Sequence, residues 1–139
     1  MKALICDTGP LLAALNDRDK HHAASVALFD GFDGVLIVPS LIVTEVCYLA
    51  QTQIGTHAEV RFLDSIVARE LIIEHPTEQD WKRIAQLVRQ YAGFPLGVAD
   101  ASVISVAERL GVTTLASLDH RHMHAVKPAH CDGFELLPS

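Results

Sequence analysis

Five short apolar runs set the pattern of this chain, and longer segments that mix polar and apolar positions separate them. The runs are continuous rather than alternating in hydrophobicity, which is typical of strands buried on both faces of a parallel sheet. Gly9 and Pro10 follow the first run closely, and Pro39 ends the second, as expected where strands give way to turns. We expect strands at residues 3–6, 35–38, 71–75, 112–116 and 134–137.

Helical spacing and end signals occupy the segments between these strands. Ser40 suits an N-cap and Gly55 closes the helix that follows it, while Gly111 stops the helix before the fourth strand. Thr77 and Asp80 form a capping-box pattern. We expect helices at residues 11–15, 21–29, 41–53, 57–68, 77–91 and 99–110, with a polar, His-rich loop after the fourth strand. This alternation predicts an α/β fold, a three-layer α/β/α sandwich around a mostly parallel sheet.

The composition fits one domain that spans residues 1–139, because half of the residues are hydrophobic and supply a packed core. No apolar run approaches the roughly 20 residues of a membrane span, and the first residues lack the basic and apolar regions of a signal peptide. We therefore expect a cytoplasmic protein that does not enter a membrane. The cysteines Cys6, Cys47 and Cys131 are odd in number and lack CxxC spacing, so we expect reduced side chains in apolar surroundings.

The net charge of −6 argues against a protein that binds nucleic acid through a broad basic surface. Local contacts with phosphates remain open. Arg61, Arg69, Arg83 and Arg89 lie on expected helices, where they could meet phosphates or simply form solvated helix faces.

Four acidic residues each stand alone in an apolar stretch: Asp7, Glu45, Asp100 and Asp119. Moving an unpaired carboxylate into low-dielectric surroundings is costly, and a shared Mg²⁺ or Mn²⁺ would relieve that cost with the hard oxygen ligands that these ions prefer. Asp7 and Asp119 follow expected strands, and ligands bind beyond the carboxyl ends of parallel strands. Taken singly, each Asp has another explanation, as a helix cap or a turn residue.

Glu45 is the acid that capping does not explain. Leu41, Tyr48 and Leu49 lie three or four positions from it, which places Glu45 on an apolar stripe of its expected helix. We therefore expect Glu45 to be shielded from solvent and to face the same crevice as the three Asp residues.

Four segments carry a family resemblance that spans the chain: ICDTGPLLAALN, PSLIVTEVCYLA, PLGVADASVISVAERLG and VTTLASLDHRHM. They resemble the corresponding segments of PIN-domain ribonucleases, and the chain is most similar to the single-domain VapC toxins of bacterial toxin–antitoxin systems. The family pattern places an acid at each of the four isolated positions. Departures occur at Gly9, where Ser is frequent, at Ser117, where Thr is usual, and at His122, where the pattern favours an aromatic residue.

The resemblance implies metal-dependent hydrolysis of RNA phosphodiester bonds. It assigns Asp7, Asp100 and Asp119 as ligands of Mg²⁺ or Mn²⁺, and Glu45 as a water-mediated ligand or proton acceptor. Thr8 and Ser117 would donate the hydrogen bonds that orient these carboxylates. All four acids would then be catalytic, and no side chain would act as a nucleophile.

The resemblance also implies partners: an RNA substrate, a cognate antitoxin and a second copy of the chain in a homodimer. We expect the antitoxin to cross the acidic crevice. Tyr48 and Leu49 could form part of that contact, although core packing is the simpler role for both side chains. The sequence does not identify the RNA.

Other functions remain open at this stage. A zinc site could form from the alternating histidines of the polar loop and two residues near them: His120, His122, His124, His130 and Cys131. A receiver-like or phosphatase-like domain would also gather acids around Mg²⁺, but Asp7 lacks the DxD spacing and no GxxxxGK[ST] loop is present. A non-catalytic interaction module is a third possibility.

Overall fold

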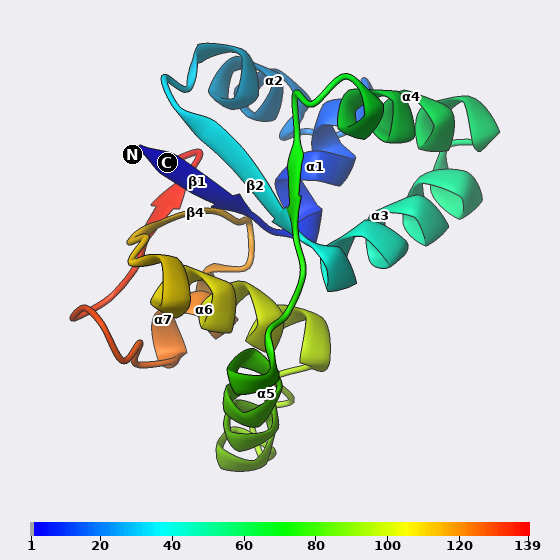
Figure 1. The fold of residues 1–139 in the computed structure, drawn as a ribbon. Helices are drawn as coiled ribbons and strands as arrows, with labels where there is room; N and C mark the ends of the chain where they lie inside the picture. The colour runs from blue at the N-terminus through cyan, green and yellow to red at the C-terminus, as the bar shows by residue number, and fades with distance from the viewer. Residues whose placement is uncertain (1) are drawn as a thin grey trace.

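Five strands form one sheet at the centre of the fold, in the spatial order β3-β2-β1-β4-β5 (Figure 1). The structure is a computed structural model that describes residues 2–139. The strands are β1 (Ala3–Cys6), β2 (Val35–Pro39), β3 (Ile72–Glu74), β4 (Thr114–Ala116) and β5 (Glu135–Leu137). Each neighbouring pair is parallel. The predicted strands are therefore confirmed in place and direction, although three of them are shorter than expected.

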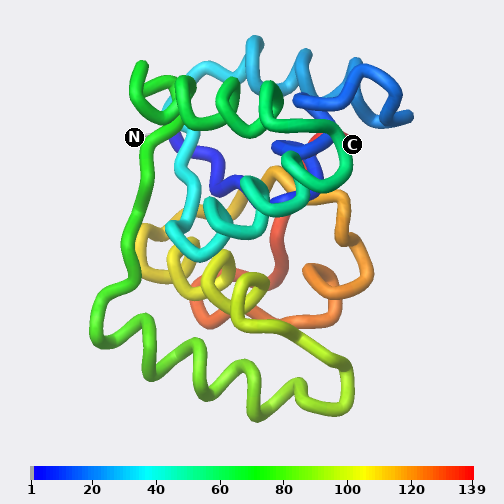
Figure 2. The backbone as a smooth tube through the Cα atoms, turned by 90° about the vertical axis from the view of Figure 1, so that its right-hand side faces the viewer, coloured from blue at the N-terminus to red at the C-terminus, as the bar shows by residue number. Residues whose placement is uncertain are grey.

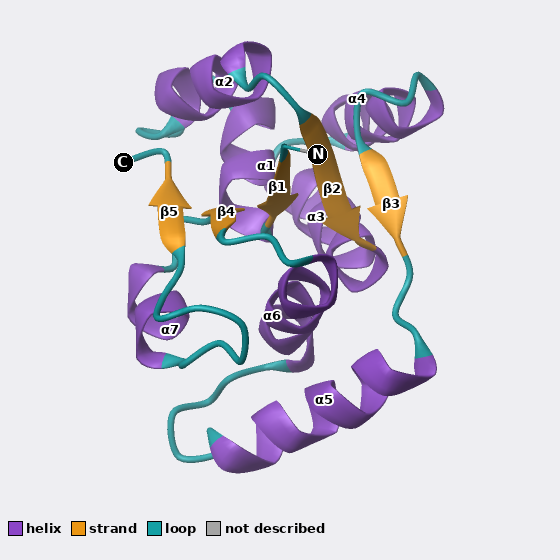
Figure 3. Cartoon of the chain, turned by 60° about the vertical axis from the view of Figure 1, so that its left-hand side comes forward, coloured by secondary structure: helices purple, strands orange, loops and turns teal. Residues whose placement is uncertain are grey.

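Helices cover both sides of this sheet, as the three-layer prediction requires (Figure 3). They are α1 (Thr8–Leu15), α2 (His22–Gly31), α3 (Ser40–Gln53), α4 (Thr56–Val67), α5 (Glu78–Gln90), α6 (Val98–Leu110) and α7 (His120–Ala125). Helix α1 packs against α2, α3 and α4, while α6 packs on β1 and β2 and against α5. Figure 2 shows α5 along the outer margin of the molecule beside α6.

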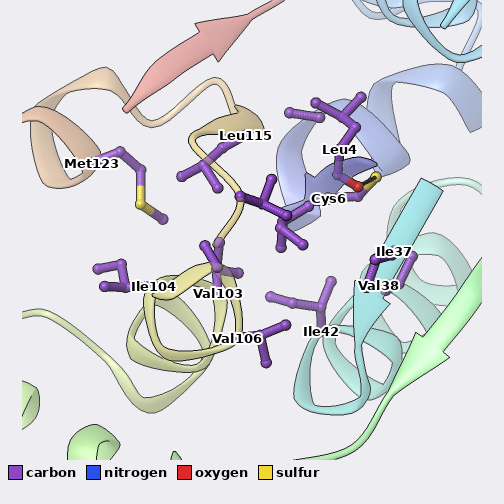
Figure 4. Close-up of a cluster of buried hydrophobic side chains, with 14 of the residues drawn as sticks. Leu4, Cys6, Ile37, Val38, Ile42, Val103, Ile104, Val106, Leu115 and Met123 are labelled. Atoms are coloured by element: carbon purple, nitrogen blue, oxygen red, sulfur yellow. Dashed lines mark hydrogen bonds between the residues drawn. The ribbon is translucent and has the colours of Figure 1, made fainter. Parts of the chain in front are cut away.

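The core lies between the sheet and α6 (Figure 4). Leu4 and Leu115 of the sheet are fully buried, and Val103, Ile104 and Val106 of α6 are fully buried with them. Burial of each such side chain contributes roughly 1.5–3 kcal/mol. Helix α6 is buried without interruption from residue 101 to residue 107, so its middle turns are held firmly in the core.

End signals account for several helix boundaries. The capping box that opens α5 is confirmed, because Asp80 N–H donates to Thr77 Oγ1 at 3.1 Å and Thr77 N–H donates to Asp80 Oδ2 at 2.9 Å. Gly111 adopts φ +68°, the left-handed conformation that glycine tolerates at a helix end. The prediction of Ser40 as an N-cap is wrong: Ser40 is the first residue of α3, and Pro39 occupies the cap position at the end of β2.

Two segments differ from the expected elements because a carboxylate caps a helix there. Helix α1 begins at Thr8 rather than at Leu11, since Asp7 is its N-cap. The expected loop at residues 120–125 is helix α7, capped by Asp119. Only Met123 of this short helix is buried, so its sequence has no apolar periodicity to reveal it.

The three cysteines are free, as predicted, but only Cys6 is buried, while Cys47 and Cys131 are half-buried. Within residues 2–139, no helix combines the length and apolarity that crossing a membrane requires.

Candidate functional site

The isolated acids lie at the edge of the sheet where the parallel strands end. Asp7 directly follows β1, and Asp119 lies three residues beyond the end of β4. Asp100 is in the first turn of α6, and Glu45 is in the second turn of α3, the helix that follows β2. The topology therefore places acids that are far apart in the sequence at the same end of the sheet, where ligands bind in parallel α/β folds.

Asp7 is buried, with only 5% of its surface exposed. Its Oδ1 accepts a hydrogen bond from Thr8 N–H at 2.8 Å, and its Oδ2 accepts one from the Ser117 hydroxyl at 2.9 Å. The pKa of Asp7 is raised to about 6, mainly by burial. The hydrogen bonds from Thr8 and Ser117 oppose this rise, and the charges of Asp100 and Asp119 add to it. Asp7 is thus a carboxylate held in place but short of positive charge.

Asp100 is half-buried, and its Oδ2 accepts a hydrogen bond from Gly97 N–H at 3.4 Å. Burial is the main reason that its pKa is raised, and the charges of Asp119 and Glu45 act in the same direction. The Gly97 hydrogen bond and the nearby His122 oppose that rise. Asp100 therefore shares an acidic environment with the other isolated acids.

Asp119 is the N-cap of α7 and is about one-third exposed. Its Oδ1 accepts from His122 N–H at 3.1 Å, and the His122 Nδ1 lies 2.9 Å from its Oδ2. Its own N–H donates to the Ser117 Oγ at 3.1 Å. The Ser117 hydroxyl thus links the Asp7 carboxylate to the main chain of Asp119 and, among residues 2–139, makes no hydrogen bond with the Asp119 carboxylate.

Glu45 is exposed, so the expectation that an apolar stripe shields it is wrong. The side of α3 that faces the core carries Ile42, Val46 and Ala50 instead. Tyr48 is 65% exposed, which shows that the stripe through Glu45 points outward. Glu45 nevertheless lies near enough to Asp100 for its charge to raise the pKa of that residue.

Thr8 is buried beside Asp7, but it orients the carboxylate through its backbone N–H rather than through its hydroxyl. In the described part of the chain, the buried Thr8 Oγ1 has no hydrogen-bond partner. A buried hydroxyl without a partner is costly, and a polar group or a water molecule bound at this edge would satisfy it.

The donor set suits a divalent cation of the Mg²⁺ or Mn²⁺ type. It consists of carboxylates that raise one another's pKa, next to the unsatisfied Thr8 hydroxyl. In the side-chain conformations of residues 2–139, no three His, Cys, Asp or Glu residues lie close enough together to hold an ion. Each Asp instead accepts a hydrogen bond from a backbone N–H of its own helix region. Rotation of these short side chains would be needed to bring their oxygens together.

The sequence did not identify His122 as a neighbour of Asp119, because the segment that holds both was expected to be a loop. The sequence did contain a signal for this contact. His122 lies three residues after Asp119, and an N-cap Asp accepts a hydrogen bond from the backbone N–H at that position. The alternative zinc site is not supported, because within residues 2–139 the histidines and Cys131 form no group close enough to hold an ion.

A second feature was not expected from the sequence: a cavity of about 520 Å³ between α1, α2 and α4. Its lining includes the apolar side chains of Leu15, Phe29 and Phe62, and its charged members are Asp30, Arg61 and Glu70. None of the isolated acids lines this cavity. It is therefore a separate surface from the acidic edge.

Comparisons with known proteins agree with one another. The PIN domain family model matches residues 4–127. Ribonuclease VapC26 of Mycobacterium tuberculosis is 29% identical over 97% of this chain and 100% of its own length. The crystal structure of Mycobacterium tuberculosis VapC20, a Sarcin-Ricin loop cleaving toxin, superposes with a TM-score of 0.81 at 18% identity, covering 88% of this chain and 94% of that chain. The DNA-bound VapBC structure from Salmonella typhimurium gives a TM-score of 0.71 at 15% identity over 98% and 97% of the two chains.

Proposed function

Because this chain belongs to the PIN domain family, we propose that it is a metal-dependent endoribonuclease that acts as the toxin of a toxin–antitoxin pair. The observation that carries the proposal is the buried carboxyl group of Asp7, surrounded by the charges of Asp100 and Asp119 at the carboxyl edge of the sheet. The similarity over the full length of Ribonuclease VapC26 supports RNA as the substrate.

In this proposal Asp7, Asp100 and Asp119 hold Mg²⁺ or Mn²⁺. The bound ion would polarise a phosphoryl oxygen of the RNA and lower the pKa of an attacking water. Asp7 needs no large movement, because Thr8 N–H and Ser117 Oγ already fix its carboxylate. The Asp119 carboxylate would give up its contact with the His122 imidazole and bind the ion instead.

Glu45 keeps its proposed role despite its exposure. A proton acceptor must be reachable by water, and the exposed position of Glu45 near Asp100 meets that condition. The Ser117 hydroxyl orients the Asp7 carboxylate and accepts a hydrogen bond from the Asp119 backbone N–H, and Thr8 contributes through its own backbone N–H. We expect Thr8 Oγ1 to gain a partner when the site is filled.

The proposal includes an antitoxin, supported by solved neighbours such as the VapBC structure from Salmonella typhimurium and a toxin–antitoxin complex from Klebsiella pneumoniae. Besides the expected contact across the acidic edge, the cavity between α1, α2 and α4 offers such a partner a second contact, because apolar side chains line it together with Asp30, Arg61 and Glu70. We further propose that residues 1–139 act as one nuclease domain, as a homodimer, in the cytoplasm.

The direct test is an incubation of purified protein with transfer, ribosomal and messenger RNA in buffer that contains Mg²⁺ or Mn²⁺. We expect discrete fragments in the presence of either ion and intact RNA when EDTA is added. Intact RNA of all three classes at every metal concentration would contradict the proposal, and cleavage that persists in EDTA would contradict its metal dependence.

A further inference from the structure

Arg121 and Phe94 form a cation–π pair beside the acidic edge. The Arg121 guanidinium carbon lies 4.9 Å from the centroid of the Phe94 ring. The same ring lies 4.9 Å from the imidazole of His122, centroid to centroid, at 55°. Since His122 contacts the Asp119 carboxylate, the pair is connected to the candidate site through one residue.

This pair joins two segments that are distant in the sequence. Phe94 lies in the connection between α5 and α6, which leads to Asp100, and Arg121 lies in the first turn of α7, which Asp119 caps. Both segments therefore carry an isolated acid a few residues away. The position of Arg121 is set by the same two elements that set the positions of Asp100 and Asp119.

Arg121, unlike Arg83 and Arg109, forms no ion pair within residues 2–139. Arg83 forms an ion pair with Glu108, and Arg109 forms ion pairs with Glu74 and Asp80. Arg121 is exposed and makes no ion pair within residues 2–139, although Asp119 is only two residues away. Cation–π attraction to Phe94 restrains the guanidinium, and no carboxylate within residues 2–139 occupies its N–H groups in an ion pair, so they can bind an anion.

We propose, on the basis of the proposed ribonuclease function, that Arg121 binds a phosphate of the RNA strand beside the carboxylate site and that Phe94 positions it. A chain with net charge −6 and an acidic edge repels RNA, so cations next to that edge are needed to hold the strand. A guanidinium makes paired hydrogen bonds to phosphate oxygens, whereas a lysine offers only a point charge. The contact positions the strand and carries no base specificity.

The test uses Arg121→Gln, Arg121→Lys and Phe94→Leu. Arg18→Gln serves as the control, because Arg18 is also exposed and also forms no ion pair within residues 2–139. Arg18 follows the C-terminal end of α1, whereas Asp7 caps the N-terminal end of that helix. Each change is made in the wild type for cleavage kinetics and in Asp100→Asn for binding without cleavage. The ligand is a labelled single-stranded RNA that the wild type cuts.

For an exposed contact, we expect Arg121→Gln to weaken RNA binding about two- to fivefold and to raise KM similarly, with little change in kcat. The slope of log Kd against log salt should fall in magnitude by about 0.7, the value for one lost phosphate contact with a single strand. Arg121→Lys should keep that slope. Phe94→Leu should weaken binding with the slope retained, and Arg18→Gln should change neither quantity.

An unchanged Kd and salt slope in Arg121→Gln, with a wild type that cuts RNA, would overturn this inference and leave the ribonuclease proposal intact. An equal loss of affinity in Arg18→Gln would also overturn it, since the effect would then follow net charge alone. A wild type that cuts no RNA would overturn the proposed function and this inference with it.

Discussion

The Ser117 hydroxyl donates a hydrogen bond to the buried Asp7 carboxylate at 2.9 Å, across 110 positions of the sequence. The backbone repeats this connection, because Asp7 N–H donates to Ala116 O at 2.8 Å. The end of β1 is thus fixed to the end of β4 by both a side chain and the main chain. The position of Asp7 therefore depends on sheet pairing, whereas its protonation depends on burial and on the neighbouring acids.

We expect Asp7→Asn to stabilise the metal-free protein at pH 8. The raised pKa of Asp7 means that the native state retains its proton between pH 3.8 and about 6, where the unfolded chain releases it. The native state therefore loses stability as the pH rises through this window, by about 3 kcal/mol if the whole shift applies. Asn removes the charge and can still accept the hydrogen bond from Thr8 N–H.

Urea unfolding in EDTA at several pH values measures this difference. The advantage of Asp7→Asn over wild type should be largest at pH 8 and should fade below about pH 4. Asp17→Asn is the control, because Asp17 is exposed in the connection between α1 and α2. If Asp7→Asn has the same stability as wild type at every pH, Asp7 does not carry an unfavourable buried charge.

Ser117→Ala should destabilise the protein more at pH 8 than at pH 4. Its hydroxyl donates to a carboxylate that is charged at the higher pH, and loss of such a bond costs about 1–3 kcal/mol. Ser102→Ala is the matched control, because Ser102 is also fully buried but donates to the backbone oxygen of Ala99. Urea unfolding at both pH values should give a pH-dependent cost for Ser117→Ala alone; equal pH dependence in the two variants would refute the assigned contact.

Mn²⁺ or Mg²⁺ should stabilise the wild type against thermal unfolding. At a free metal concentration one hundredfold above its dissociation constant, the gain is about 2.7 kcal/mol. Asp100→Asn should reduce the gain, because it removes one of the carboxylates assigned to the metal while Asn can still cap α6 through Gly97 N–H. Scanning calorimetry with and without metal measures the shift in melting temperature. A wild-type melting temperature that is unchanged by millimolar metal would remove support for the site.

Ala14→Arg should prevent binding of the antitoxin, because Ala14 lines the cavity between α1, α2 and α4 and a long charged side chain would fill it. Co-expression with a candidate antitoxin, followed by affinity purification, reports the complex. Ala23→Arg is the control, since Ala23 is exposed on α2 and does not line the cavity. A complex that survives Ala14→Arg would place the antitoxin on another surface.

Continuous apolar runs predicted the strands because burial on both faces of a parallel sheet requires them. The same reasoning failed for α7, where HRHMHA buries only Met123 and the helix depends on the cap that Asp119 supplies. It also failed for Glu45, because Leu41, Tyr48 and Leu49 lie on a half-exposed side of α3 and the helix buries a different side against the core. The pair of Arg121 and Phe94 could not be predicted, since their proximity depends on how α7 packs against the connection between α5 and α6.

The most direct test of the account is the single-turnover rate of RNA cleavage in Mg²⁺ by Asp100→Asn, compared with wild type and with Asp64→Asn. Asp64 is exposed on α4 and serves as the matched control. Asp100→Asn should fold and should cut RNA at least about a hundredfold more slowly, because loss of residues that merely orient metal ligands already costs 10- to 100-fold. Asp64→Asn should cut at the wild-type rate. Cleavage by Asp100→Asn at the wild-type rate would contradict the claim that the carboxylates at this edge form the active site.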